Sequence, residues 1–289
     1  MHVFIVNPIA GGGFALKAEE ALRNEMNRRH APCAFLRTES PGHAEVLATQ
    51  AALSGASAVI SVGGDGTSLE VARGLVGKRA VLGIIPAGTG NDLVKTLGIP
   101  RDLKSALDVA LNGTPRKVDA ARINGKLFLN VAGLGFDVRV LDETERFKKH
   151  LRGLLPYLCG LVCAIVRYKP THVRLTTDSG EQELDALICA AANGRYIGGG
   201  IAICPDASVE DGLLDVVVVR DQPRWKLPRY LPGLMMKRIL KFRITSRVKA
   251  KRVEIDSPGA RVQVDGEISP MDHVVVEALP GALQINLPG

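Results

Sequence analysis

A glycine-rich segment with a single carboxylate, Gly63-Gly64-Asp65-Gly66-Thr67, constrains the fold of this chain more than any other stretch. It directly follows an apolar run, residues 58–62, that is typical of a buried strand. Glycines after a strand let backbone amides point at phosphate oxygens, and the helix that begins at Thr67 presents its positive end to the same charge. The segment predicts a phosphate-binding loop, with Gly63, Gly64, Gly66 and Thr67 as its contacts.

Asp65 is the unusual member of this loop, because a bare carboxylate repels a phosphate. A divalent cation between the two anions removes the conflict, and Mg²⁺ prefers oxygen ligands of this kind. We therefore expect Asp65 to hold Mg²⁺ or a water molecule bound to it.

A second loop of this type, residues 86–92, follows the apolar run 81–85. Because the carboxyl ends of neighbouring parallel strands lie side by side, we expect the two loops to face one crevice. Thr89 is then a phosphate contact and Asp92 a partner of Asp65 at the metal. Asp119 is the third candidate carboxylate, although it could equally end a strand or pair with a nearby arginine.

These motifs resemble the catalytic domain shared by bacterial diacylglycerol kinases, sphingosine kinases and ceramide kinases. The resemblance runs nearly from end to end and is carried by 63–67, 88–92, the opening Asn7-Pro8-Ile9-Ala10-Gly11, the segment 206–214 and Val264-Asp265-Gly266-Glu267. It implies a kinase that transfers the γ-phosphoryl group of ATP to a lipid hydroxyl, with diacylglycerol as the expected acceptor and phosphatidic acid as the product.

The resemblance also implies roles for individual residues. It makes nucleotide contacts of Asn7, Pro8, Ile9, Ala10, Gly11 and Thr38. It makes Glu267 the acceptor of the hydroxyl proton and implies a structural Mg²⁺ held by Ser208, Asp211 and the backbone of Leu213. One departure is that no basic residue follows Gly11 directly; Lys17 and Lys95 are the candidates to supply that cation.

Other functions remain open at this stage. The first loop also resembles that of NAD kinases and phosphofructokinases, so a soluble metabolite kinase is one alternative. A second alternative is a lipid kinase with another acceptor, of the phosphatidylglycerol, sphingoid or ceramide type. A third is a non-catalytic relative that binds membranes. Asp265-Gly266 is a favoured turn dipeptide, so Glu267 could belong to an ordinary hairpin. Neither a Walker A motif nor a Rossmann fingerprint occurs, which excludes those two classes.

The chain divides into two regimes. Residues 1–120 alternate strands, near 2–6, 32–37, 57–62 and 81–85, with helices, near 15–29, 43–53, 67–76, 91–97 and 103–112. This pattern predicts a three-layer parallel α/β nucleotide-binding domain. Residues 121–289 are rich in short β runs and predict an antiparallel β-sandwich, with helical insertions near 138–168 and 224–240. The resemblance implies that this second domain binds the lipid and that the last residues, 283–287, return to the first domain.

The net charge of +7 is concentrated in one segment. Residues 224–252 hold eleven Lys and Arg and no Asp or Glu, so the rest of the chain is net negative. Trp225, Leu231, Leu234 and Met235 lie among these cations as candidate anchors. The pattern favours an anionic membrane surface as partner and a cytoplasmic, peripheral location at the inner face of the membrane. A solvated basic face is the alternative; nucleic acid is not expected, and a homodimer is left open.

The most apolar stretch is Leu154–Val166, 13 residues long. It falls well short of the roughly 20 residues that cross a bilayer. We expect a buried helix, with a helix that lines an acyl-chain cleft as the alternative.

Overall fold

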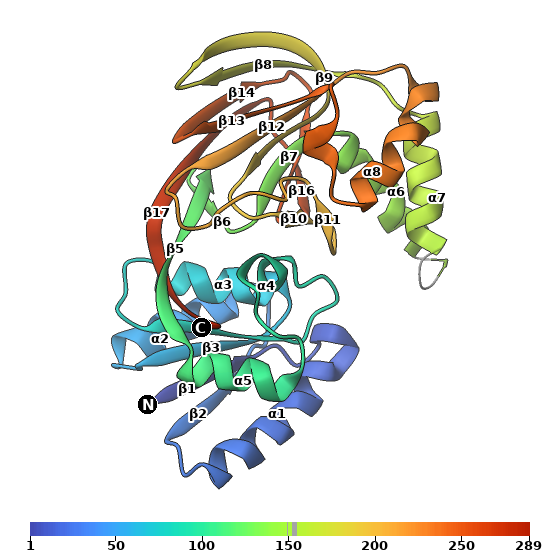
Figure 1. The fold of residues 1–289 in the computed structure, drawn as a ribbon. Helices are drawn as coiled ribbons and strands as arrows, with labels where there is room; N and C mark the ends of the chain where they lie inside the picture. Colours follow the sequence, from blue (N-terminus) through green and yellow to red (C-terminus); the bar gives the residue numbers. More distant parts are fainter. Residues whose placement is uncertain (149, 152–154) are drawn as a thin grey trace. The chain divides into compact units, whose positions relative to one another are not determined.

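The computed structural model describes residues 1–148, 150–151 and 155–289, which form two compact units (Figure 1). The first unit contains Met1–Ala120, Val209–Asp211 and Leu279–Gly289, and the second contains Ala121–Ser208 and Gly212–Ala278. Among the described residues, no helix combines the length and the apolarity that crossing a bilayer requires.

The first unit is a parallel sheet with helices on both faces. Its strands are β1 (His2–Val6), β2 (Cys33–Arg37), β3 (Ala58–Gly63) and β4 (Val81–Pro86), and its helices are α1 (Ala10–Arg28), α2 (His43–Leu53), α3 (Asp65–Leu75), α4 (Asp92–Leu97) and α5 (Leu103–Asn112). The strand order is β2-β1-β3-β4, and the end of β17 (His273–Leu287) adds a fifth parallel strand through Ile285 beside Leu82.

Apolar side chains on both faces of the strands explain the three layers. All six residues of β3 are buried, as in a parallel strand covered from both sides. Leu22 and Met26 of α1 and Leu107 of α5 pack with Phe4 and Ile60 on one face. Helices α2 and α3 contact each other and the sheet, and Figure 1 shows them on the other face. The predicted three-layer α/β architecture is confirmed.

The second unit is an antiparallel β-sandwich. Its elements include β5 (Thr114–Ile123), β6 (Lys126–Phe128), β7 (Val131–Gly135), β8 (Thr171–Thr177), β9 (Gly180–Ala192), β10 (Tyr196–Ile197), β11 (Ile201–Ala202), β12 (Leu214–Arg220), β13 (Thr245–Ala250), β14 (Arg252–Asp256), β15 (Arg261–Val264) and β16 (Glu267–Pro270). Strand β9 pairs with β8 through its first half and with β7 and β12 through its second half. The predicted sandwich is therefore confirmed.

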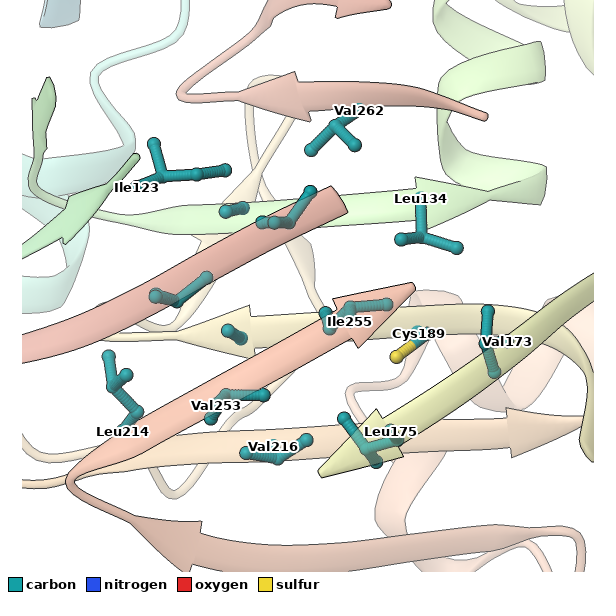
Figure 2. Close-up of a cluster of buried hydrophobic side chains, with 14 of the residues drawn as sticks. Ile123, Leu134, Val173, Leu175, Cys189, Leu214, Val216, Val253, Ile255 and Val262 are labelled. Carbon is teal, nitrogen blue, oxygen red and sulfur yellow. The ribbon is translucent and has the colours of Figure 1, made fainter. Parts of the chain in front are cut away.

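Alternating side chains give this unit two cores. Inward-facing residues from several strands meet in one of them, which Figure 2 shows: Leu134, Val173, Leu175, Cys189, Val216, Val253, Ile255 and Val262. The opposite side chains of β9 and β12, such as Ala190 and Val217, form a second core with Phe136, Ala164, Leu227 and Ile239. The helical insertions of this unit cover the second core.

These insertions are α6 (Phe136–Lys148), α7 (Leu155–Val166), the 3₁₀ helix η1 (Arg224–Tyr230), α8 (Leu231–Met235) and the 3₁₀ helix η2 (Ile239–Lys241). The expected helical region 224–240 is thus broken into short pieces, because Pro228 and Pro232 lack the N–H that a continuous helix needs. The expected β run 243–255 is two strands, since β13 pairs with β12 whereas β14 pairs with β8 and β17.

The expectation of a buried helix over the apolar stretch 154–166 is wrong for one of its faces. Leu155, Leu158, Val162 and Val166 are each at least 50% exposed. Leu154 lies outside the described residues, as does the side chain of Met235. A uniformly apolar helix gives no sequence signal about which face is covered.

Candidate active site

Three loops of the first unit meet at the carboxyl ends of β1, β3 and β4. Their backbones are bonded together, because the N–H of Asn7 donates to the carbonyl of Val62 (3.0 Å) and the N–H of Ala87 donates to the carbonyl of Gly63 (2.7 Å). The two glycine loops therefore lie side by side, as the neighbouring strand ends predicted.

Glycine is required where these loops approach each other. A Cβ on Gly88 would lie 2.3 Å from the Cα of Gly64, and a Cβ on Gly63 would lie 2.5 Å from Oγ1 of Thr67. Gly11 has a φ of +60°, and a Cβ there would lie 2.2 Å from the carbonyl oxygen of Ala87. The glycines thus allow three segments of bare backbone to pack against one another, as phosphate-binding loops do.

Asn7 shapes the first loop through its side chain. Its Nδ2 donates to Oγ1 of Thr67 (3.1 Å), and its Oδ1 accepts from the N–H of Ile9 (3.3 Å). Pro8, Ile9 and Ala10 follow, and the three left-handed glycines 11–13 lead into the regular part of α1. The N–H of Thr38, at the end of β2, donates to the carbonyl of Val6 (2.9 Å), which places Thr38 at the same edge of the sheet.

Asp65 lies at the start of α3 and faces the start of α4. Its Oδ1 accepts a hydrogen bond from the N–H of Leu93 (3.1 Å). Burial raises the pKa of the Asp65 carboxyl above its usual range, and the charge of Asp92 raises it further, whereas the backbone N–H groups of residues 91–93 act in the opposite direction. The two carboxylates therefore lie close enough to repel each other, and their role as partners at a metal stays a prediction.

Asp92 and Lys95 form an ion pair within α4. The Nζ of Lys95 lies 2.9 Å from Oδ1 of Asp92, whose side chain is only 9% exposed. Lys95 therefore neutralises a carboxylate of the site, while Lys17 is exposed on α1. Neither arrangement brings a cation into the cavity beside the glycine loops.

That cavity has a volume of about 410 Å³ and is lined by Gly11, Phe14, Pro86, Ala87, Gly88, Thr89, Asn91 and Arg101. Arg101 is exposed and precedes the N-cap of α5, Asp102. Our sequence analysis missed this arginine. The only signal was a lone cation in the short connection after the second glycine loop, and connections of this kind commonly carry function.

Asp119 is buried in β5 and takes part in the closure of the first unit. Its Oδ1 accepts from the N–H of Gly281 (2.7 Å), and its own N–H donates to the carbonyl of Val209 (2.7 Å). Arg116, one of its candidate partners, pairs instead with Glu210. Asp119 thus holds the returning C-terminal segment in place. This structural role is separate from the metal-binding role that we expected for Asp119.

Glu267 begins β16 in the second unit and is exposed at the base of a tight hairpin. Val264 and Glu267 pair across the turn, whose central residues Asp265 and Gly266 have φ values of 49° and 94°. Two positive φ values are typical of the type I′ turn that joins two adjacent strands. The hairpin expected from the turn dipeptide is thus present, and it presents the Glu267 carboxylate to solvent.

The turn itself is fixed by Asp265, a residue to which our sequence analysis gave no role of its own. Its carboxylate accepts hydrogen bonds from the N–H groups of Leu129 (2.8 Å), Asn130 (2.9 Å) and Val131 (3.1 Å). The hairpin that carries Glu267 is therefore held to the segment before β7.

The side chains and carbonyl predicted to hold Mg²⁺ supply oxygen donors of the kind that a divalent cation takes. Asp65 and Asp92 supply hard carboxylate oxygens, and their mutual repulsion is of the kind that a bound cation relieves. Ser208, Asp211 and Leu213 lie in the loop between β11 and β12, and supply a hydroxyl, a carboxylate and a backbone carbonyl, which are oxygen ligands as well. Within the described ranges, no group of three or more His, Cys, Asp or Glu side chains is arranged to hold a metal.

Comparisons with known proteins agree with this arrangement. Residues 1–123 match the diacylglycerol kinase catalytic domain, and residues 130–287 match the YegS C-terminal NAD kinase beta sandwich-like domain. The chain is 33% identical to a diacylglycerol kinase of Mycobacterium tuberculosis over 98% of its own length and 94% of the relative. It is also 33% identical to a Pseudomonas aeruginosa protein named "Probable lipid kinase YegS-like", over 96% and 91%.

The fold has a solved counterpart. A diacylglycerol kinase from Bacillus anthracis superposes with a TM-score of 0.81 at 29% identity, over 99% of this chain and 96% of that one. Together, the α/β unit with its glycine loops and the β-sandwich define an enzyme, a lipid kinase. The chain belongs to the family of diacylglycerol kinases and YegS-like lipid kinases. Membership of this family implies ATP as a substrate.

Proposed function

We propose that this lipid kinase transfers the γ-phosphoryl group of ATP to the hydroxyl group of diacylglycerol and releases phosphatidic acid and ADP. The observation that carries the proposal is the near full-length similarity to a relative named diacylglycerol kinase. The glycine loops, which pack around Asp65 in the first unit, support it because they have the form of a phosphate-binding crevice.

The first unit would bind the nucleotide. Exposed amide groups of residues 63–67 and 86–90 would contact phosphate oxygens, with the hydroxyl groups of Thr67 and Thr89 beside them. Thr38 and the segment 7–11 would complete the nucleotide site at the same edge of the sheet. Arg101, in the lining of the 410 Å³ cavity, would provide the cation that does not follow Gly11 in this chain.

Glu267 would accept the proton of the acceptor hydroxyl. As the hydroxyl oxygen forms its bond to the γ-phosphorus, the bond from that phosphorus to the β,γ-bridging oxygen breaks and ADP leaves. A carboxylate accepts this proton while the O–H bond weakens in the transition state. The Asp265 contacts to residues 129–131 hold the hairpin in place for this step.

Asp65 and Asp92, with Asp119 near the closing strand, are the proposed ligands of a catalytic Mg²⁺ network. When bound, Mg²⁺ neutralises phosphate charge and so favours attack on the γ-phosphorus. Ser208, Asp211 and the backbone of Leu213 are the proposed holders of a structural Mg²⁺.

Since the acceptor is a membrane lipid, we also propose that the enzyme works peripherally at an anionic membrane surface. The basic segment 224–252 supports this through its excess positive charge. Arg247 and Arg252 of that segment, however, are paired with carboxylates, and Leu234 packs on the second core.

Incubation of the protein with γ-labelled ATP, Mg²⁺ and one lipid at a time tests the proposed function. The panel holds diacylglycerol, phosphatidylglycerol, ceramide and sphingosine, and products are separated by thin-layer chromatography. We expect label in phosphatidic acid and none with the Asp65→Ala variant. Asp108→Ala, which removes a surface partner of Arg29, is the matched control and should label as the wild type does. Label in another lipid, without phosphatidic acid, would contradict diacylglycerol as the acceptor.

A further inference from the structure

Helix α7 is apolar on two opposite faces, of which one is buried in the second unit. Gly160 and Ala164 lie on the buried face. A Cβ on Gly160 would lie 2.5 Å from Oγ1 of Thr144, which belongs to α6. Figure 1 shows the two helices side by side. Small residues thus let α7 approach α6 closely, and this contact sets the rotation of α7 about its axis.

The opposite face consists of large apolar side chains in solvent. Leu155, Leu158, Val162 and Val166 are 55%, 50%, 60% and 62% exposed. Their spacing of three and four residues places them on one side of the helix. Single exposed apolar side chains are ordinary on a protein surface, whereas a row of four marks an interaction site.

Another exposed apolar side chain lies in η1, near the end of α7. The Nη1 of Arg224 donates to the backbone carbonyl of Val166 (3.4 Å), which brings η1 to the carboxyl end of the helix. The next residue, Trp225, is 74% exposed and lies under the Nζ of Lys226, 5.1 Å from the ring centroid. We name Leu155, Leu158, Val162, Val166 and Trp225 the α7 face.

Exposed cations come from the segments next to this face in the chain, α6, η1 and the residues after α7. Arg146 and Arg167 are 66% and 60% exposed, although both reach the nearly buried carboxylate of Glu143. Arg224 and Arg229 of η1 are exposed as well, as is Lys169. Glu145 is an exposed carboxylate on α6, but the cations outnumber it. Such a combination suits an anionic bilayer, because the apolar side chains can enter the acyl layer while the basic side chains contact the anionic headgroups.

We infer that the α7 face is the element by which this protein docks on an anionic lipid bilayer. The inference rests on the proposed lipid kinase function and moves the apolar anchor from residues 231–235 to α7 and Trp225. A second copy of the chain is the poorer occupant, because a symmetric contact through this face would bring the same cations together. Trp225 suits the bilayer boundary, where an indole keeps its ring in the apolar layer and its N–H near water.

Trp225 is the only tryptophan in the chain, so its fluorescence reports on this face without a label. The probe is a vesicle of phosphatidylcholine with about one third phosphatidylglycerol. We expect a blue shift of the emission on mixing with the wild-type protein, quenching by lipids brominated on their acyl chains, and weaker binding at high salt. Co-sedimentation without any change in Trp225 emission would overturn the inference, since another surface would then bind the vesicle.

The double variant Leu158→Gln/Val162→Gln removes the centre of the apolar row and leaves every cation in place. We expect its partition onto the vesicles to fall about tenfold or more, because two apolar side chains no longer enter the acyl layer. The matched control is Val46→Gln/Leu53→Gln, which changes two similarly exposed apolar residues of α2 in the first unit. Equal binding by the α7 variant and the wild type overturns the inference, as does a wild-type dimer that the α7 variant abolishes.

A separate assay keeps this inference apart from the proposed function. The wild-type protein is given ATP and a short-chain diacylglycerol that dissolves without vesicles. Phosphorylation there tests the lipid kinase reaction alone, whereas the emission of Trp225 tests docking alone. Docking with no phosphorylation contradicts the proposed function and supports the docking face. Phosphorylation with no docking supports the proposed function and contradicts the docking face.

Discussion

The carboxylate of Asp265 lies 2.8 Å from the backbone nitrogen of Leu129 and accepts its hydrogen bond. The same carboxylate serves the next two amides along the chain. One side chain thereby satisfies three backbone donors and holds the hairpin that presents Glu267.

Asp265→Ala should destabilise the second unit. It leaves three amide groups without their acceptor, and we expect a loss of about 2–4 kcal/mol in the free energy of unfolding. Urea unfolding followed by circular dichroism measures this loss. Asp272→Ala is the control, because the carboxylate of Asp272 accepts one exposed hydrogen bond, from the N–H of Gly259, and its removal should cost less than about 1 kcal/mol. Equal losses in the two variants would contradict the anchoring role.

Glu267→Gln should slow the phosphoryl transfer and spare nucleotide binding. The amide keeps the size of the carboxylate but cannot accept the proton, so we expect kcat to fall by roughly 10²–10⁴-fold. Steady-state kinetics with ATP as the varied substrate separate kcat from KM. Glu181→Gln, at another exposed carboxylate of the second unit, should leave both unchanged. A comparable rise in KM for ATP would indicate a structural role for the hairpin instead.

Arg101→Ala should weaken ATP binding. If this side chain contacts a phosphate from the lining of the cavity, its loss should raise KM for ATP about tenfold, as expected for one charged hydrogen bond. Arg79→Ala removes an exposed arginine from the connection between α3 and β4 and should leave KM unchanged. An unaltered KM in the Arg101 variant would contradict this role of Arg101, and Lys17 would then be the candidate for the cation that does not follow Gly11.

Asp137→Asn should stabilise the protein at neutral pH. Both carboxylate oxygens of Asp137 are buried, and within the described part of the chain neither makes a hydrogen bond of good geometry, although the N–H of Val138 and the side chain of Gln263 lie near enough to oppose the effect of burial on its pKa. Burial raises the pKa of Asp137 to about 6. Since this value exceeds that of the unfolded chain, the native state binds more protons between pH 4 and 6, and stability falls as the pH rises through that window.

The Asn variant removes this penalty, which is on the order of 1–3 kcal/mol at pH 7. Melting temperatures recorded from pH 4 to 7 should therefore converge at the acid end, separate between pH 4 and 6 and stay apart above pH 6, with the variant higher. Glu20→Gln, at an exposed carboxylate of α1, is the control and should follow the wild type throughout. A wild-type-like profile for the Asn variant would show that the Asp137 carboxyl is not strained by its burial.

Local patterns were enough to predict the first unit. The apolar runs 58–62 and 81–85 are the strands β3 and β4, and the glycine loops that follow them pack together as expected. Asp265 could not be predicted in the same way, because its partner Leu129 is 136 positions away along the chain. The exposure of Val162 was hidden for a different reason: hydropathy measures how apolar a helix is and says nothing of which face a neighbour covers.

Strand β17 belongs to both units, since it begins beside β14 and ends beside β4. Its last residues lie beside β4 in the first unit, where the side chains of Leu283, Ile285 and Leu287 are buried. The first unit is therefore completed by a segment that follows the whole second unit in the sequence, although its other strands are made first. During synthesis this edge of β4 stays unpaired and apolar until the second unit has been made, and a chain cut before residue 279 never covers it.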